Sequence, residues 1–131
     1  MLGVVAQCLA EITVLAEKGG ISRTDFLGFL NNSVMGSTFS RYKTPAVVEL
    51  SFTPPTFTPE LLRNDFDLGL DAAADLGVSL PLARHVRELV QRMIDDGFLD
   101  VDFAALLEVH ARESDLTPVP EPGPVADGLE P

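Results

Sequence analysis

The polar residues best placed for chemistry form a short run, Arg63-Asn64-Asp65-Phe66-Asp67, between apolar stretches. The Asn64 amide both donates and accepts hydrogen bonds, and the carboxylates beside it accept hydrogen bonds or bind cations. Two interpretations fit this run: a solvated face near a helix start, or the rim of a cleft that presents Asn64 to a ligand. Phe57, in the proline-rich segment just before it, either plugs the core or walls the same cleft.

Two further groups of polar side chains have helical spacing. Gln7 and Glu11 lie four positions apart in an apolar stretch, so they share a helix face and predict either a structural hydrogen-bonded pair or a stripe lining a cleft. The arginines within residues 84–92 are candidates for an anion site. Since only Arg84 and Arg87 are close neighbours on a helix, we expect these arginines to pair with the abundant acids instead.

The motifs of several enzyme classes do not occur in this sequence. It contains no Gly-x-Gly-x-x-Gly or phosphate-loop pattern and no Gly-x-Ser-x-Gly elbow. His85 and His110 stand far apart, without a cysteine or second histidine at the spacing of zinc ligands. We therefore predict no catalytic residue and no metal site in this chain.

The elements that must position these residues are predicted to be helices. Residues 2–16 are apolar at all but four positions, and Glu17 and Lys18 follow as a polar last turn. A helix with this pattern is predicted to be buried nearly all round. Domains usually begin with a polar, loosely held terminus, so we expect the chain to be truncated at its start. Ser22 and Ser37 have the spacing of N-caps for two short helices, with Pro45 beginning or kinking the continuation of the second.

The second half of the chain carries the clearest helix signals. Thr58-Pro59-Glu60 combines an N-cap hydroxyl, a proline at the first helical position and an acid in the first turn, and this helix is expected to end at Gly77. A further amphipathic helix is predicted over 79–97. Asp100 is the expected N-cap of a final helix.

The fold predicted from these signals is all-α, with five to six helices. No stretch alternates with period two for long, so no sheet is predicted. After about residue 115 the sequence becomes acidic and proline-rich, with no apolar face to bury. We expect a helical domain over 1–112 and a disordered tail over 113–131.

Composition also limits the partners of this chain. The net charge is −11, from 9 Lys+Arg and 20 Asp+Glu, and phosphate-backbone binding needs clustered cations. The apolar start is shorter than the roughly 20 residues of a membrane span, and it lacks the basic residues that open a secretory signal. We expect a cytoplasmic protein with no nucleic-acid partner and no membrane partner.

Four segments, in order and spacing, resemble the C-terminal helical domain of the β-hydroxyacid dehydrogenases, which include 3-hydroxyisobutyrate dehydrogenase and tartronate semialdehyde reductase. They are AEITVLAEKGG (10–20), LRNDFDLGL (62–70), AADLGVSLPL (73–82) and DFAAL (102–106). The resemblance covers about residues 1–110. It implies a two-domain enzyme, in which an N-terminal Rossmann domain binds NAD or NADP. A helical domain like that of 6-phosphogluconate dehydrogenase then closes the substrate cleft and dimerises.

The same resemblance implies roles for individual positions. The family's catalytic lysine falls upstream of Met1, so its acid/base group is expected to be absent. Asn64 stands where the family has a lysine that reaches cofactor and substrate, followed by Asp65 at the family's aspartate, and Phe57 matches a family phenylalanine. Asn64 and Phe57 are thus the expected cofactor-binding residues, with a neutral amide in place of an ammonium.

The expected function is that of a C-terminal domain fragment of an NAD(P)-dependent oxidoreductase acting on a small β-hydroxy acid. This fragment would supply a cleft wall and a homodimer interface through the helix of residues 2–18. The cofactor belongs to the parent enzyme, and we expect the chain alone to bind none and to be inactive. The alternative is a non-enzymatic, self-associating helical protein that uses its first helix as the interface and its acidic tail for solubility.

Overall fold

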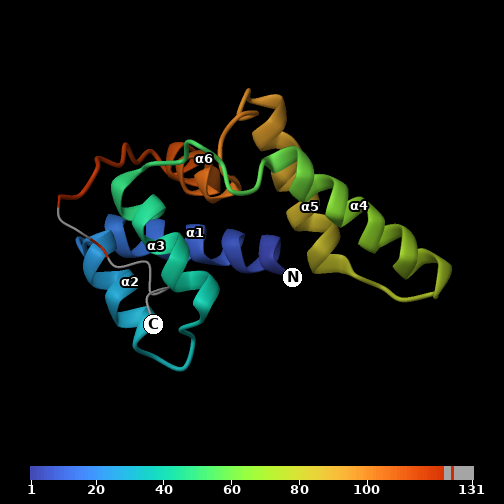
Figure 1. Cartoon of the computed structure of the whole chain (residues 1–131), viewed down its shortest axis with the longest axis horizontal. Helices are drawn as coiled ribbons and strands as arrows, with labels where there is room; N and C mark the ends of the chain where they lie inside the picture. Colours follow the sequence, from blue (N-terminus) through green and yellow to red (C-terminus); the bar gives the residue numbers. More distant parts are fainter. Residues whose placement is uncertain (123–124, 126–131) are drawn as a thin grey trace.

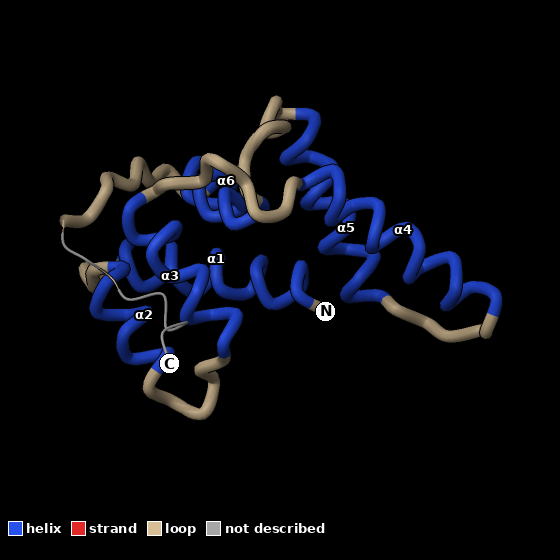
Figure 2. Tube along the Cα trace, viewed as in Figure 1, coloured by secondary structure: helices blue, strands red, loops and turns tan. Residues whose placement is uncertain are grey.

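The computed structural model describes residues 1–122 and 125, and the regular structure of that part is entirely helical (Figures 1 and 2). The elements, in order, are α1 (Leu2–Lys18), α2 (Arg23–Asn31), α3 (Thr38–Glu49), α4 (Pro59–Asp75), α5 (Pro81–Asp95), the 3-10 turn η1 (Phe103–Ala105) and α6 (Leu106–Glu113). Since no strand occurs among these residues, the all-α prediction is confirmed.

Helix α1 lies at the centre of the molecule and packs against α2, α5, α6 and η1. Helices α2 and α3 form a hairpin towards one end, while α4 and α5 form a longer hairpin that projects at the other end, beside the N-terminus of α1 (Figure 1). The core lies between α1, α5, η1 and α6. Its most deeply buried side chains are Val14, Val86, Val90, Met93, Phe103, Ala105, Leu106, Leu107 and Ala111.

Three of the predicted helix starts are confirmed by their capping geometry. The hydroxyl oxygens of Ser22, Ser37 and Thr58 each accept a hydrogen bond from the backbone N–H three residues on, at 3.0, 3.0 and 3.4 Å. Each bond satisfies one of the donors that a helix start leaves without a partner. Pro45 lies inside α3, which continues unbroken to Glu49.

The N-cap of the last helical segment is Asp102 and not the predicted Asp100. Its carboxylate accepts a hydrogen bond from the Ala104 N–H at 2.9 Å, and the segment begins as η1 before it continues as α6. Asp102 is buried beside Lys43, whereas Asp100 is exposed. Because both positions hold an acid, the choice depends on a lysine that is distant in sequence.

The prediction that α1 is buried nearly all round is wrong. One side of the helix, with Ala6 and Ala10, is buried against its neighbours, but Ile12 and Leu15 are exposed on the other side. Glu11 is exposed as well. In the part of the chain that the structure describes, the helices cover one side of α1, and its other side is an open apolar face.

The prediction of disorder after residue 113 is wrong for the part that the structure describes. Residues 114–122 run across the ends of α1, α2 and α3, and Leu116 packs against the core. This segment is held mainly by hydrogen bonds that Lys18, Arg23 and Thr24 donate to it, largely through Glu121. Polar contacts of this kind leave no apolar pattern in the sequence. The predicted disorder of 123–124 and 126–131 concerns residues outside the described part.

Candidate functional site

The hollow that Phe57 lines lies at the N-terminus of α1, and we call it the N-terminal groove. Its volume is about 360 Å³. The lining comes from α1, α3, the proline-rich loop, α4 and η1, with Met1, Leu2, Gly3, Tyr42, Thr56, Phe57, Leu62, Asp65, Phe66 and Phe103. A mostly apolar concavity with a few polar groups is the usual form of a small-molecule site.

A second hollow of about 460 Å³ adjoins the N-terminal groove and shares Met1, Asp65 and Phe66 with it. The remaining lining residues of this second hollow come from α1, α4 and the start of α5. Where α1 meets α4, a Cβ atom on Gly3 would lie 2.6 Å from the Phe66 ring. Only glycine permits this close approach, which brings the start of α1 against the helix that carries Asp65.

A buried ion pair fixes the loop that carries Phe57. The Lys43 Nζ lies 2.7 Å from both carboxylate oxygens of Asp102, and the two residues are only 5% and 4% exposed. The same carboxylate accepts hydrogen bonds from the Thr56 N–H at 3.0 Å, the Thr56 hydroxyl at 2.6 Å and the Phe57 N–H at 3.3 Å. One carboxylate therefore joins α3, the loop and the start of η1.

Backbone and aromatic contacts complete this attachment of the loop. The Phe103 N–H donates to the Phe57 carbonyl at 3.0 Å, and the Asp102 N–H donates to the Phe52 carbonyl at 2.8 Å. The Phe57 ring stands edge-on to the Phe103 ring, with centroids 6.1 Å apart. Phe57 thus packs against the core and also lines the N-terminal groove. The two positions proposed for it from the sequence are therefore compatible.

The environment of Asp102 and that of Glu121 both favour the charged carboxylate. Burial pushes the pKa of Asp102 up, but hydrogen bonds from Lys43, Thr56 and Ala104, together with the Lys43 charge, hold that pKa below its ordinary value of 3.8. Burial likewise raises the pKa of Glu121. Hydrogen bonds from Thr24 and Arg23 and the Arg23 charge outweigh it, so the Glu121 pKa lies below 4.5.

We expect acid to destabilise the fold through these two carboxyls. Their pKa values are lower in the folded chain than in the unfolded chain, so below about pH 4.5 the unfolded chain binds more protons. The two carboxyls stabilise the fold fully at a pH above their pKa values in the unfolded chain. This stabilisation is lost as the pH falls through their pKa values in the folded chain, and the loss is about 1.4 kcal/mol for each unit by which the two pKa values differ. Urea unfolding followed by circular dichroism at constant high salt, which screens the net negative charge, measures this loss. An unfolding free energy that stays constant from pH 5 to pH 3 would contradict the prediction.

The structure separates the two predicted cofactor-binding residues. Phe57 lines the N-terminal groove, whereas Asn64 is exposed on α4 and its side-chain oxygen accepts a hydrogen bond from the Arg63 guanidinium at 3.0 Å. The next residue, Asp65, lines the groove instead. Asn64 therefore lies beside the groove and not among its lining residues.

Other predicted polar groups form structural pairs. Arg87 is paired with Asp67 at 2.7 Å, and Arg92 lies 3.4 Å from Glu113, as expected for ion pairs with nearby acids. The hydrogen bond from Arg87 and its charge lower the pKa of Asp67, against a smaller effect of burial. The Gln7 amide donates a hydrogen bond to the Glu11 carboxylate at 2.8 Å, so these two side chains form the predicted structural pair.

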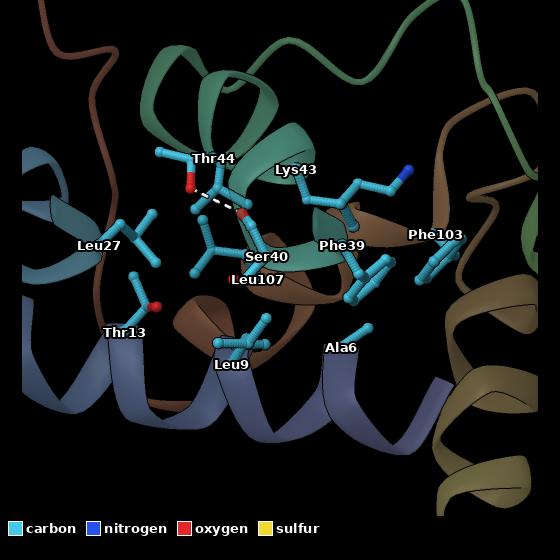
Figure 3. A pocket seen from close by; sticks show the side chains of 13 residues that line it. Ala6, Leu9, Thr13, Leu27, Phe39, Ser40, Lys43, Thr44, Phe103 and Leu107 are labelled. Carbon is cyan, nitrogen blue, oxygen red and sulfur yellow. Dashed lines mark hydrogen bonds between the residues drawn. The ribbon is translucent and has the colours of Figure 1, made fainter. Parts of the chain in front are cut away.

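A third, much smaller hollow lies between α1, α2, α3, η1 and the start of α6 (Figure 3). Its volume is about 20 Å³, and its lining is almost entirely apolar, with Leu9, Leu27, Phe39 and Leu107 among its residues. A space of this size holds about one water molecule. We regard it as a packing defect of the core and not as a ligand site.

Residues 1–122 and 125 contain no group of three or more His, Cys, Asp or Glu side chains arranged to hold a metal ion. No helix in this part of the chain has the length and apolar character needed to span a bilayer.

Several site residues were missed in the sequence. Tyr42 and Thr56 line the N-terminal groove, but neither belongs to a motif with a chemical meaning. Lys43 and Asp102 are 59 positions apart, and no local pattern pairs residues at such a distance. Asp65 was indicated by the run that contains Asn64 and by the family resemblance, but neither distinguished which of the two side chains faces the groove.

Most of the chain is similar in sequence to known proteins. Residues 1–110 match the family model described as NAD-binding of NADP-dependent 3-hydroxyisobutyrate dehydrogenase. Glyoxylate/succinic semialdehyde reductase 1 of Arabidopsis thaliana is 29% identical over 108 residues, which are 82% of this chain and 37% of that protein. A probable 3-hydroxyisobutyrate dehydrogenase of Mycobacterium tuberculosis is 26% identical over 121 residues, which are 88% of this chain and 41% of the relative.

Solved structures share the helical fold. A 3-hydroxyisobutyrate dehydrogenase from Salmonella typhimurium aligns with a TM-score of 0.76 at 23% identity, covering 82% of this chain and 37% of the other. The Mycobacterium tuberculosis 3-hydroxyisobutyrate dehydrogenase with L-serine aligns with a TM-score of 0.73 at 25% identity, covering 83% and 39%. The chain thus spans about two fifths of the length of these proteins.

Proposed function

Because this chain belongs to the 3-hydroxyisobutyrate dehydrogenase family of NAD(P)-dependent dehydrogenases, we propose that its helices form one wall of the cleft where nicotinamide and substrate meet. The complete reaction would be hydride transfer between the nicotinamide and a small β-hydroxy acid or its aldehyde. The observation that carries this proposal is the N-terminal groove, which Phe57 and Asp65 line while Asn64 lies beside it.

The residues of the N-terminal groove fit one part of a dinucleotide and not another. Its apolar lining suits a flat nicotinamide ring or the carbon chain of a small substrate. Its one charged side chain is Asp65, so the groove has no lysine or arginine for the diphosphate, and the neutral Asn64 amide cannot act as one. We therefore propose that a separate dinucleotide-binding unit holds the phosphates, and that this chain alone binds NAD or NADP weakly at most.

Each residue of the proposed wall has a role that its position supports. Phe57, held by the Asp102 carboxylate, would exclude water from one side of the nicotinamide and substrate. The Asp65 carboxylate would accept a hydrogen bond from a substrate hydroxyl, and the Asn64 amide would donate one to a carboxylate at the rim. These roles orient ligands, and the proton transfer of the reaction is not assigned to this chain.

We expect millimolar NADPH to shift the NMR amide signals of Gly3, Phe57 and Asp65 without saturating them, because the groove receives only part of the dinucleotide. Asn64→Lys adds a cation beside the groove and should tighten binding by up to about fivefold, the effect of an exposed ion pair worth up to about 1 kcal/mol. Leu68→Lys is the matched control, because it adds the same charge one turn further along α4, outside both hollows.

Two results would contradict the proposed cleft wall. One is that NADPH leaves the groove amides unchanged in the parent chain and in Asn64→Lys. The other is that Leu68→Lys tightens binding as much as Asn64→Lys, since a general charge effect does not depend on the groove.

We also propose that the open apolar face of α1 is the interface of a homodimer. Met1, Val5, Cys8, Ile12 and Leu15 recur at alternating spacings of four and three, and none of them carries a charged side chain. This is the spacing with which one helix packs along a second helix at a shallow angle. A second copy of α1 offers the same face, as a two-fold interface requires.

The alternative function, a non-enzymatic self-associating helical protein, uses the same α1 face but gives the N-terminal groove no ligand. The NADPH titration separates the two, because only the cleft-wall function predicts shifts at Phe57 and Asp65. The two proposals therefore differ at the groove and agree on the dimer.

A further inference from the structure

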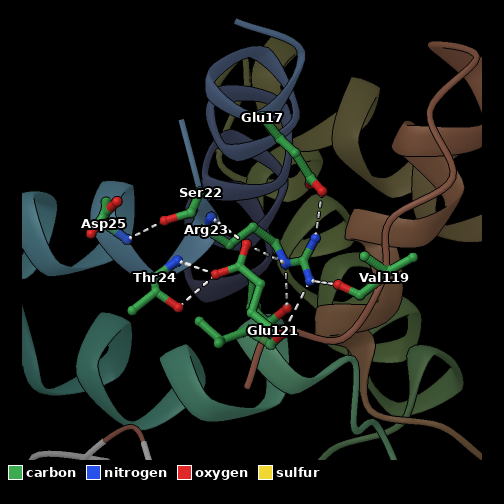
Figure 4. Close-up of polar contacts among 9 residues, drawn as sticks. Glu17, Ser22, Arg23, Thr24, Asp25, Val119 and Glu121 are labelled. Atoms are coloured by element: carbon green, nitrogen blue, oxygen red, sulfur yellow. Dashed lines mark hydrogen bonds and ion pairs between the residues drawn. The ribbon is translucent and has the colours of Figure 1, made fainter. Parts of the chain in front are cut away.

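The C-terminal segment 114–122, which we call the strap, crosses the N-terminus of α2 and the C-terminal ends of α1 and α3 (Figures 1 and 4). Its attachment begins where the Lys18 ammonium donates to the Ser114 carbonyl at 2.9 Å. Leu116 packs against the core, while Val119 is exposed. At its far end the Glu121 N–H donates to the Val48 carbonyl at 3.1 Å.

The Glu121 carboxylate binds the first two backbone donors of α2. The Arg23 N–H donates to one carboxylate oxygen at 2.6 Å, and the Thr24 N–H and hydroxyl donate to the other at 2.8 and 2.6 Å. Ser22 caps the donor that follows, on Asp25. The helix thus leaves two N–H groups for a ligand from outside, and the positive end of the helix dipole favours a carboxylate there.

The side chain of Arg23 adds a second component to this site. It is 0% exposed, and its guanidinium donates to the Val47 carbonyl at 3.1 Å, the Val48 carbonyl at 3.0 Å and the Glu17 carboxylate at 2.7 Å. These three acceptors belong to α1 and α3. Two further contacts reach the strap: a hydrogen bond to the Val119 carbonyl and an ion pair with Glu121 at 3.9 Å (Figure 4).

The contacts of Arg23 with the helices are separate from its contacts with the strap, as expected for a preformed binding site. The helices provide three of the acceptors of the Arg23 guanidinium, and these three contacts do not involve the strap. The backbone donors of Arg23 and Thr24 are fixed by α2 in the same way. The strap therefore meets a site whose parts are already oriented, and such preorganisation reduces the entropy cost of binding.

We infer that the N-terminus of α2 and Arg23 form a recognition site for an extended, acidic, proline-flanked peptide segment, and that residues 114–122 occupy it as a detachable strap of the same chain. Glu121 is the determinant of this recognition, and prolines on either side, Pro120 and Pro122, favour the extended conformation. Leu116 supplies an apolar anchor five residues earlier. Release of the strap exposes this site without unfolding the helices.

Amide hydrogen exchange of the full chain tests this inference. Glu121→Ala removes both carboxylate oxygens, and we expect the amides of Arg23, Thr24 and Glu121 to exchange about tenfold faster or more. Glu121→Gln keeps one acceptor oxygen and should give an intermediate rate. The amide of Val90, deep in the core, should keep its protection in both variants.

Asp115→Asn is the matched control, because it removes one negative charge from the same segment. Asp115 has a positive φ of 52°, which asparagine also tolerates, so the strap keeps its path. The inference predicts parental exchange at α2 in this variant. Parental exchange at α2 in Glu121→Ala as well, or equal acceleration by Asp115→Asn, would overturn it.

A synthetic peptide of residues 114–122 tests recognition separately from the covalent connection. Added at millimolar concentration to the Glu121→Ala chain, it should restore slow exchange at Arg23 and Thr24, and failure to do so would overturn the recognition site. Protection in the parent chain should not depend on protein concentration. If it rises with concentration, the strap comes from a second copy and docking within one chain is wrong.

Discussion

Replacing Asp102 with alanine is expected to lower the free energy of unfolding by about 3–5 kcal/mol, the usual loss when one partner of a buried ion pair is removed. The Lys43 ammonium would keep only the Thr56 hydroxyl, at 2.8 Å, as a hydrogen-bonding acceptor. The backbone donors at Thr56, Phe57 and Ala104 would lose their acceptor as well. Urea unfolding at neutral pH measures the loss.

The partner substitution provides the control for this prediction. Lys43→Met is expected to cost less than Asp102→Ala, because the Asp102 carboxylate keeps its hydrogen bonds from Thr56, Phe57 and Ala104. Asp102→Ala should also broaden or shift the NMR signals of Phe57, since its loop is no longer attached. Equal losses for the two variants would show that the charge pair matters and the hydrogen-bond network of Asp102 does not.

Replacing Leu15 with glutamate is expected to convert the proposed dimer into a monomer of 14.1 kDa. In a two-fold interface the substitution acts twice, and placing two unpaired carboxylates in an apolar contact should weaken dimerisation by at least about a hundredfold, or about 2.8 kcal/mol. Sedimentation equilibrium of the full chain measures the mass. The parent chain should have about twice the mass of the variant.

A control for this substitution exists on another helix. Leu68 on α4 is 70% exposed, against 69% for Leu15, so Leu68→Glu makes the same chemical change at an equally exposed leucine. We expect Leu68→Glu to remain dimeric. A monomeric parent chain, or equal dissociation by both variants, would show that α1 is not the interface.

The helices of this protein were largely predictable because their signals are local. Ser22, Ser37 and Thr58 cap the helices whose starts they mark in the sequence, and each needs only a backbone N–H three residues away. Gly77 and Gly97 end their helices with positive φ values of 69° and 93°, which glycine adopts without strain. Such interactions involve residues within one helical turn of each other, so they can be inferred from the sequence.

The candidate site was predictable only in part. The run around Asn64 and the aromatic Phe57 indicated the segment that borders the N-terminal groove, and Phe57 does line this groove. Which of the adjacent residues Asn64 and Asp65 lines the groove depends on how α4 is rotated against α1. At this end of α4, Phe66 lies against Gly3 of α1, a residue that is far away in sequence.

The sequence by itself determined the helical class, most of the helix starts, and the family to which the chain belongs. Only the tertiary structure decided that Asp102 and not Asp100 caps the last segment, that α1 is covered on one side, and that residues 114–122 bind across α2. Each of these outcomes rests on a contact between distant residues, such as Lys43 with Asp102 or Arg23 with Glu121. A buried charge needs a partner in space, and sequence spacing carries no information about which distant residue the fold brings to it.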